Sequence, residues 1–171
     1  MKKIVIVLLL LASCFSSFAK ASINKKKKKA KKEITSVLVY HTACFGRCPE
    51  YKIEVNKSGI ATYTGIRFVP DSGVYTKKIG TKLAKEILSP FTTYLIDTFP
   101  NRYESLIQDL PGVELTVYYP GSTKNISNAH FGPPLLGRLR AKLDSILMRK
   151  MDETGLLPLD NTWHKVTGGR K

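Results

Sequence analysis

Apolar and polar residues alternate along four stretches in the first half of the chain, which is the pattern of half-buried β-strands. The stretches cover residues 35–42, 51–55, 60–68 and 74–79. The turn residues Asn56-Lys57-Ser58-Gly59 lie between the second and third stretches and predict a β-hairpin there. This half of the chain is therefore expected to form an antiparallel sheet.

The spacing of apolar residues becomes helical after residue 80. Apolar residues between 83 and 95 recur every three or four positions, which predicts an amphipathic helix with Thr81 as its N-cap. Pro90 lies inside this pattern. It is expected either to kink the helix or to begin a second one capped by Ser89.

The second half repeats the order of strands and then a helix. Alternation over 113–119, a turn at 120–122 and a partner at 124–131 predict a second strand pair, after a loop at 101–111. An apolar stripe from Leu136 to Leu147 predicts a second amphipathic helix that ends near Gly155.

This order predicts one α+β domain over residues 34–155, an antiparallel sheet of about five or six strands with two helices packed on one face. Residues 156–171 show no period and are expected to form an irregular C-terminal tail.

The N-terminus has the pattern of a bacterial signal peptide. Two lysines follow Met1, and the apolar run Ile4–Ala12 comes next, too short to span a membrane. Ala19-Lys20-Ala21 fits ordinary cleavage and gives a signal peptide of residues 1–21. Leu11-Ala12-Ser13-Cys14 resembles a lipobox, in which Cys14 becomes the acylated N-terminus. The protein is expected to be exported, as a periplasmic or secreted protein or as a membrane-anchored lipoprotein.

The charge is concentrated in a short segment. The chain of 171 residues carries a formal charge of +15, but residues 1–32 hold ten lysines and no acid, and the rest holds 18 basic and 13 acidic residues. The domain itself is only mildly basic, so no specific nucleic-acid recognition is expected. Residues 22–33 predict a solvated, disordered linker, or alternatively a contact with anionic lipid or another polyanion. The lysines concerned are Lys25, Lys26, Lys27, Lys28, Lys29, Lys31 and Lys32.

Two cysteines, Cys44 and Cys48, remain once Cys14 is lipidated or removed. They flank a turn that contains glycine, and in an oxidising compartment this arrangement favours a disulfide. A redox thiol pair is an alternative, although its usual spacing is Cys-x2-Cys. A metal site is another, and it would need His41 or His130 as an additional ligand.

The octapeptide from Cys44 to Tyr51, Cys-Phe-Gly-Arg-Cys-Pro-Glu-Tyr, follows one predicted strand and leads into another. It resembles the Cys-Phe-Gly-x-Cys-Pro-x-Tyr signature of DUF6438, a bacterial domain of unknown function. The resemblance covers about residues 34–147. It implies a short and often exported domain with a strand-rich half followed by a helix. It supplies no catalytic residues.

No constellation of catalytic residues emerges from the sequence. The three histidines are scattered and expected to be structural, and Glu50 and Glu54 alternate with apolar strand residues and are expected to face solvent. No catalytic residue, metal or cofactor is predicted. The main hypothesis is a non-enzymatic envelope or secreted binding module with an envelope protein as partner. The alternatives are a thiol–disulfide redox protein that uses Cys44 and Cys48, and a polyanion or anionic-lipid binder that uses the lysine run.

Overall fold

The computed structural model describes residues 32–104, 110–147, 151–152, 155–156 and 158–167. The expected signal peptide, Cys14, Lys25–Lys29 and Lys31 lie outside these residues, and Lys32 is the one lysine of the run that lies within them. In the described part of the chain, no helix has the length and apolar character needed to cross a membrane.

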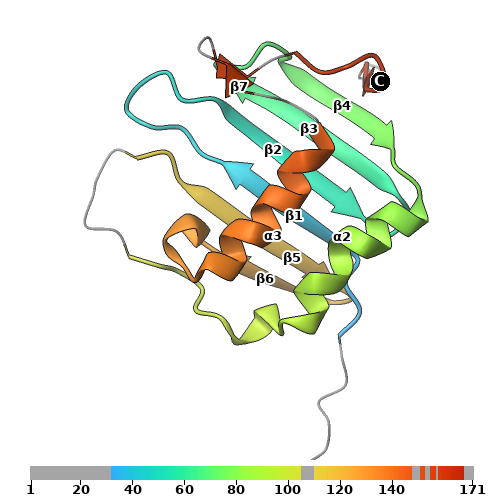
Figure 1. The fold of residues 1–171 in the computed structure, drawn as a ribbon, viewed down its shortest axis with the longest axis vertical. Helices are drawn as coiled ribbons and strands as arrows, with labels where there is room; N and C mark the ends of the chain where they lie inside the picture. The colour runs from blue at the N-terminus through green and yellow to red at the C-terminus, as the bar shows by residue number, and fades with distance from the viewer. Residues whose placement is uncertain (1–31, 105–109, 148–150, 153–154, 157, 168–171) are drawn as a thin grey trace, which may run out of the picture. The chain divides into compact units, whose positions relative to one another are not determined.

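The domain is built on a seven-stranded antiparallel sheet with strand order β6-β5-β1-β2-β3-β4-β9. Figure 1 shows the first six of these strands side by side. The strands are β1 Ser36–His41, β2 Glu50–Asn56, β3 Ile60–Arg67, β4 Gly73–Lys78, β5 Val113–Tyr119, β6 Ser122–Ile126 and β9 His164–Lys165. A separate pair is formed by β7, Met151–Asp152, and β8, Gly155–Leu156. The sheet therefore has more strands than the five or six expected.

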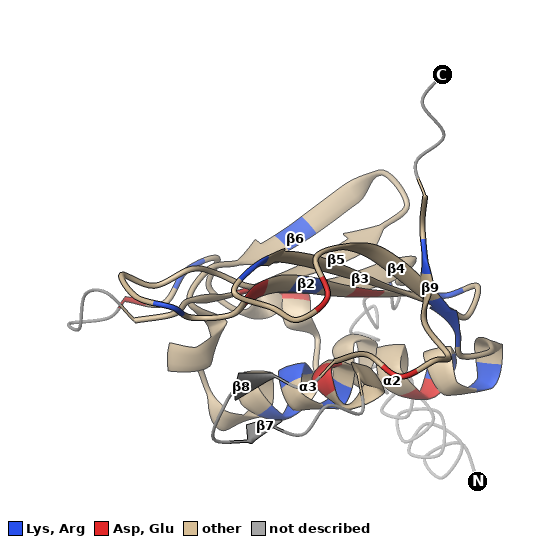
Figure 2. Cartoon of the chain, turned by 90° about the horizontal axis from the view of Figure 1, so that it is seen from above, with Lys and Arg blue, Asp and Glu red and all other residues tan. Residues whose placement is uncertain are grey.

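Two helices, α2 (Thr81–Thr93) and α3 (Pro134–Asp144), form a second layer on one side of the sheet (Figure 2). Short 3-10 turns at Ile96–Thr98, Ala129–Phe131 and Ser145–Leu147 complete the helical part. The α+β prediction, with the helices on one face, is confirmed.

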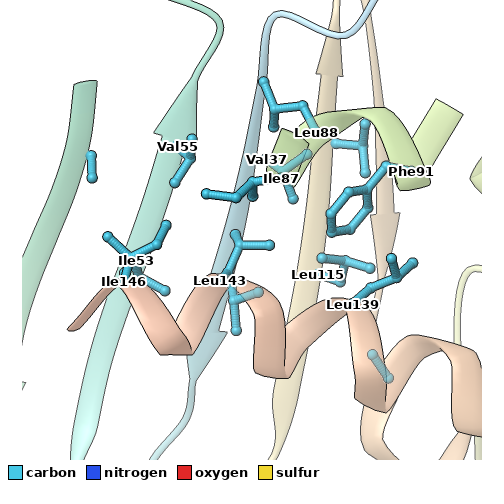
Figure 3. Close-up of a cluster of buried hydrophobic side chains, with 14 of the residues drawn as sticks. Val37, Ile53, Val55, Ile87, Leu88, Phe91, Leu115, Leu139, Leu143 and Ile146 are labelled. Carbon is cyan, nitrogen blue, oxygen red and sulfur yellow. The ribbon is translucent and has the colours of Figure 1, made fainter. Parts of the chain in front are cut away.

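The hydrophobic core lies between these two layers. Alternate residues of β1 and β2 point toward the helices because successive side chains of a strand face opposite ways. Their partners come from the apolar stripes of α2 and α3 (Figure 3). Fully or almost fully buried members are Val37, Ile53, Val55 and Leu115 of the sheet, and Ile87, Phe91, Leu139 and Leu143 of the helices.

Helix α2 differs from the prediction at its N-cap and at Ser89. Gly80 occupies the N-cap position with φ 80°, no side chain caps the helix, and Thr81 is its first residue. The helix continues through Pro90, so no second helix begins at Ser89. Pro90 has no N–H for the carbonyl of Glu86, and the Ser89 hydroxyl donates to that oxygen instead, at 3.4 Å.

The second half also departs from the predicted boundaries. Strand β6 ends at Ile126, five residues before the predicted end, and Asn128 then takes a left-handed conformation with φ 54°. Helix α3 ends at Asp144, well before Gly155, and gives way to the 3-10 turn Ser145–Leu147. Part of the loop predicted at 101–111, residues 105–109, lies outside the described residues.

Two residues of the C-terminal tail join the sheet as strand β9. Strand β9 pairs antiparallel with β4, and the Val166 N–H donates to the Val74 carbonyl at 2.8 Å. Trp163, just before β9, is 6% exposed and lies edge-on to the Tyr63 ring with centroids 6.3 Å apart. The folded domain therefore extends past residue 155.

Candidate functional site: the disulfide loop

A disulfide between Cys44 and Cys48 closes the loop that joins β1 to β2, as the spacing of the cysteines predicted. The Cα atoms of the two cysteines are 5.6 Å apart. The Gly46 N–H turns inward and donates to Cys44 Sγ at 3.2 Å. In the described chain no group of three or more metal-binding side chains occurs, so neither cysteine is part of such a cluster.

The tip of this loop exposes an aromatic side chain. Phe45 is 91% exposed, the largest exposure of any large hydrophobic residue in the described chain. Gly46 and Arg47 beside it are also exposed. Fully removing a phenylalanine side chain from water is worth about 1.5–3 kcal/mol, so this exposed ring makes the loop tip a candidate binding surface.

Further apolar surface lies next to the tip, at the end of β3. The Arg47 guanidinium lies over the Phe68 ring, 5.9 Å from its centroid. Phe68 is 48% and Ile66 is 38% exposed. Phe68 also has φ 52°, a left-handed conformation that is uncommon for an aromatic residue and recurs at binding sites. We call Phe45, Arg47, Ile66 and Phe68 the tip surface. The octapeptide contains Phe45 and Arg47, but the sequence did not identify them as part of a surface.

On the face of the sheet that the helices do not cover, Glu50 forms hydrogen bonds at the base of the loop. Its carboxylate accepts hydrogen bonds from the Tyr40 hydroxyl at 2.5 Å and from Arg67 Nε at 2.6 Å. Glu50 is only 7% exposed, so the expectation that it faces solvent is wrong. A register shift between β2 and β3 lies between Glu50 and Tyr51, beside these two hydrogen bonds.

These contacts change the acidity of both partners. The hydrogen bonds from Tyr40 and Arg67 lower the pKa of Glu50. The hydrogen bond to Glu50, aided by burial, raises the pKa of Tyr40 to about 12. Glu50 is therefore an anion and Tyr40 a neutral donor throughout the physiological pH range.

On the face of the sheet that the helices cover, His41 makes contacts at the same end of the sheet. Its ring stacks on Tyr51 of the octapeptide, with centroids 4.3 Å apart and planes inclined by 16°. His41 Nε2 lies 3.0 Å from Asp144 Oδ1, and Arg140 Nε lies 3.7 Å from the other oxygen of Asp144. These contacts join the end of α3 to the end of β1 beside the loop.

Two hydrogen bonds also link the start of the loop to the residue before β5. The Thr42 N–H donates to the Gly112 carbonyl at 3.0 Å, and the Gly112 N–H donates back to the Thr42 hydroxyl at 2.8 Å. The loop is thus cross-linked by its disulfide and anchored at its base from three directions. Such a loop loses little conformational entropy when it binds.

The family profile described as "Domain of unknown function (DUF6438)" matches residues 35–147 of the chain. The chain belongs to the DUF6438 family. No curated protein and no solved structure matches it. The matched part of this DUF6438 protein begins one residue before β1 and ends with the 3-10 turn after α3, so it contains the disulfide loop and leaves out β9.

The other two histidines of this DUF6438 protein, His130 and His164, have different surroundings. Both ring nitrogens of His130 are buried and have no hydrogen-bond partner among the described residues. Burial lowers the pKa of His130, and the positive charge of Arg140 acts in the same direction. His164 lies exposed on β9. His41 contacts Tyr51 and Asp144, which lie on β2 and at the end of α3.

We expect the double substitution Cys44→Ser with Cys48→Ser to lower the free energy of unfolding by about 2 kcal/mol, the chain-entropy effect of so short a closed loop. The sheet and core should remain intact because neither cysteine lies in the hydrophobic cluster. Chemical denaturation under non-reducing conditions measures the loss. The wild type in reductant should unfold like the variant, and a variant that fails to fold would contradict the prediction.

Proposed function

We propose that this DUF6438 protein is an exported, non-enzymatic binding module that engages a protein partner of the cell envelope through the tip surface. One observation carries the proposal: Phe45 is 91% exposed on a loop that a disulfide closes. Export is supported by the signal-peptide pattern of residues 1–21 and by the presence of the disulfide, which is typical of oxidising compartments.

The composition of the tip surface indicates what the partner offers. Aromatic residues and arginine dominate the binding energy of protein interfaces, where they fill apolar pockets rimmed by polar groups. Arg47 is exposed and cationic, and Arg67 lies nearby with its guanidinium on Glu50. A matching partner therefore has an apolar pocket for Phe45, bordered by carboxylates that complement Arg47.

The direction in which the loop points supports a protein partner. The loop follows His41, the last residue of β1, and the residues before Ser36 join the other end of that strand. Six residues of extended strand span about 20 Å. If residues 22–33 act as a tether, the tip surface lies at the end of β1 away from it and is presented outward.

We expect a photo-crosslinking amino acid, p-benzoylphenylalanine, to capture one envelope protein when it replaces Phe45 in the full chain in its native cell. The matched control carries the same amino acid at Tyr94, which is 51% exposed at the end of α2. An excess of wild-type protein should compete the adduct away because both forms use one site. The adduct is detected by blotting and identified by mass spectrometry.

Two results would contradict this proposal. One is an adduct pattern at position 45 that matches the pattern at position 94, since general exposure then explains the capture. The other is an adduct at position 45 that persists when Arg47 is replaced by Glu, because charge complementarity then has no part in binding. Arg47 is exposed, so this substitution leaves the fold intact.

Thiol–disulfide exchange is a second candidate function, favoured by one contact. The Gly46 N–H that donates to Cys44 Sγ would stabilise a thiolate there after reduction, and the Arg47 charge acts in the same sense. Equilibration with glutathione buffers tests it. A reduction potential below about −300 mV indicates a structural bond, and one near −200 mV indicates a redox-active bond. The binding proposal expects the lower value.

A further inference from the structure

A groove of about 420 Å³ lies at the opposite end of β1, between helix α2 and the segment that enters the strand. Its apolar floor is made by Ile34 and Leu88, which are 6% and 5% exposed. Lysines from three separate segments line its rim: Lys32 before β1, Lys57 in the hairpin turn and Lys85 on α2. This volume is in the range of sites that hold small molecules.

A close approach of two glycines brings these segments together. The Gly59 carbonyl, in the hairpin turn, accepts hydrogen bonds from Ile79 N–H at 2.9 Å and Gly80 N–H at 3.2 Å. A Cβ on Gly59 would lie 2.5 Å from the Gly80 carbonyl carbon, so the turn can touch the start of α2 only without a side chain. The relative position of Lys57 and α2 is therefore fixed by the backbone.

The rim keeps a net positive charge, because acidic residues pair with only two of its three lysines. Glu33 is the one acidic residue among those that line the groove, and it pairs with Lys57 at 2.8 Å. Lys32 pairs with Asp97 at 2.9 Å. Lys85 makes no ion pair with any residue that the structure describes. The first turn of α2, which begins at the groove with Thr81, holds no acidic residue, so the positive end of the helix dipole adds to the charge.

We propose that this groove binds an anionic phospholipid, with the phosphate on Lys57 and Lys85 and the first part of the acyl chains on Ile34 and Leu88. A cationic rim above an apolar floor complements a molecule that has a negative head and an apolar body. A free phosphate ion would leave the floor without a partner. The inference does not rest on the proposed function, since a different end of the domain carries it.

The test uses the purified mature protein and soluble short-chain lipids, with all variants carrying the same N-terminus. Dihexanoyl phosphatidylglycerol, added below its micelle concentration, should shift amide NMR signals of α2 and of the Lys57 turn. Dihexanoyl phosphatidylcholine and inorganic phosphate should bind at least tenfold more weakly. Replacing both Lys57 and Lys85 by Ala should weaken phosphatidylglycerol binding about thirtyfold, about fivefold for each lysine near an anionic group.

Two further variants distinguish binding in the groove from a general electrostatic attraction between the protein and the lipid. Lys82→Ala removes an exposed lysine of α2 that does not line the groove, and it should change the affinity by less than twofold. Ser89→Trp leaves every charge in place and fills the groove from an exposed position, and it should abolish binding. Equal binding by Ser89→Trp, an equal loss with Lys82→Ala, or inorganic phosphate that binds as tightly as the lipid would each overturn the proposal.

Discussion

Replacing Trp163 by alanine is expected to lower the free energy of unfolding by about 3–5 kcal/mol, the usual effect of truncating a large buried aromatic residue. Trp163 is 6% exposed, and its ring packs edge-on against Tyr63, which is fully buried in β3. The Lys77 ammonium also lies over the indole ring, 5.8 Å from its centroid. The alanine variant loses these contacts and leaves a cavity above β3.

Urea unfolding followed by circular dichroism measures this effect, because the variant lacks the chain's one tryptophan. Val166→Ala is the matched control. It removes an apolar side chain from the same segment, but Val166 is 48% exposed, and a loss within about 0.5 kcal/mol is expected. A loss below 1 kcal/mol for Trp163→Ala would mean that the C-terminal segment does not belong to the core.

Strand β9 in the C-terminal segment is an element that the local pattern of apolar and polar residues could not predict. Alternation identified β1 to β5 because each is long enough to repeat a period of two. Strand β9 has two residues, and it is held by a partner strand about 90 positions earlier in the chain. No window of residues 156–171 contains that information, so the pattern predicted an irregular tail and did not reveal β9.

The burial of Glu50 at the base of the loop was not predicted, for a related reason. Glu50 alternates with apolar residues and was therefore assigned to the solvent side. That side is correct for its strand, but its donors, Tyr40 and Arg67, come from the two neighbouring strands and cover it. The cysteine spacing predicted the disulfide correctly, whereas the exposure of Phe45 depends on how the closed loop projects from the sheet.

The two proposed surfaces lie at opposite ends of the same strands. The tip surface lies after β1 and at the end of β3, and the groove contains residues that precede β1 and follow β2. A phospholipid held in the groove would place the tip surface about 20 Å farther from the bilayer, the length of β1. The domain would then act as a spacer that presents Phe45 to a partner outside the membrane. Each end can be tested without disturbing the other.

The second large effect is expected at Glu50, where alanine should lower the free energy of unfolding by about 2–4 kcal/mol. A hydrogen bond to a charged group contributes about 1.5–3 kcal/mol, and the carboxylate accepts two, although the bond from Arg67 counts for less because that side chain is 59% exposed. Glu54→Ala is the matched control. Glu54 lies on the same strand, is only half-buried and makes no ion pair with the described residues, so about 0.5 kcal/mol or less is expected.

The pH dependence of the Glu50 effect separates a lost charge from lost packing. The folded state lowers the pKa of Glu50 below its unfolded value of about 4.5, so the contribution of the carboxylate is complete above that pH. It is lost as the pH falls through the folded pKa, because protonation removes the charge that Tyr40 and Arg67 stabilise. The difference in stability between wild type and Glu50→Gln should therefore be constant between pH 6 and 8 and shrink below about pH 4.5. Urea midpoints measured across this range give the curve, and a difference that stays constant down to pH 3 would show that the side chain acts through packing alone.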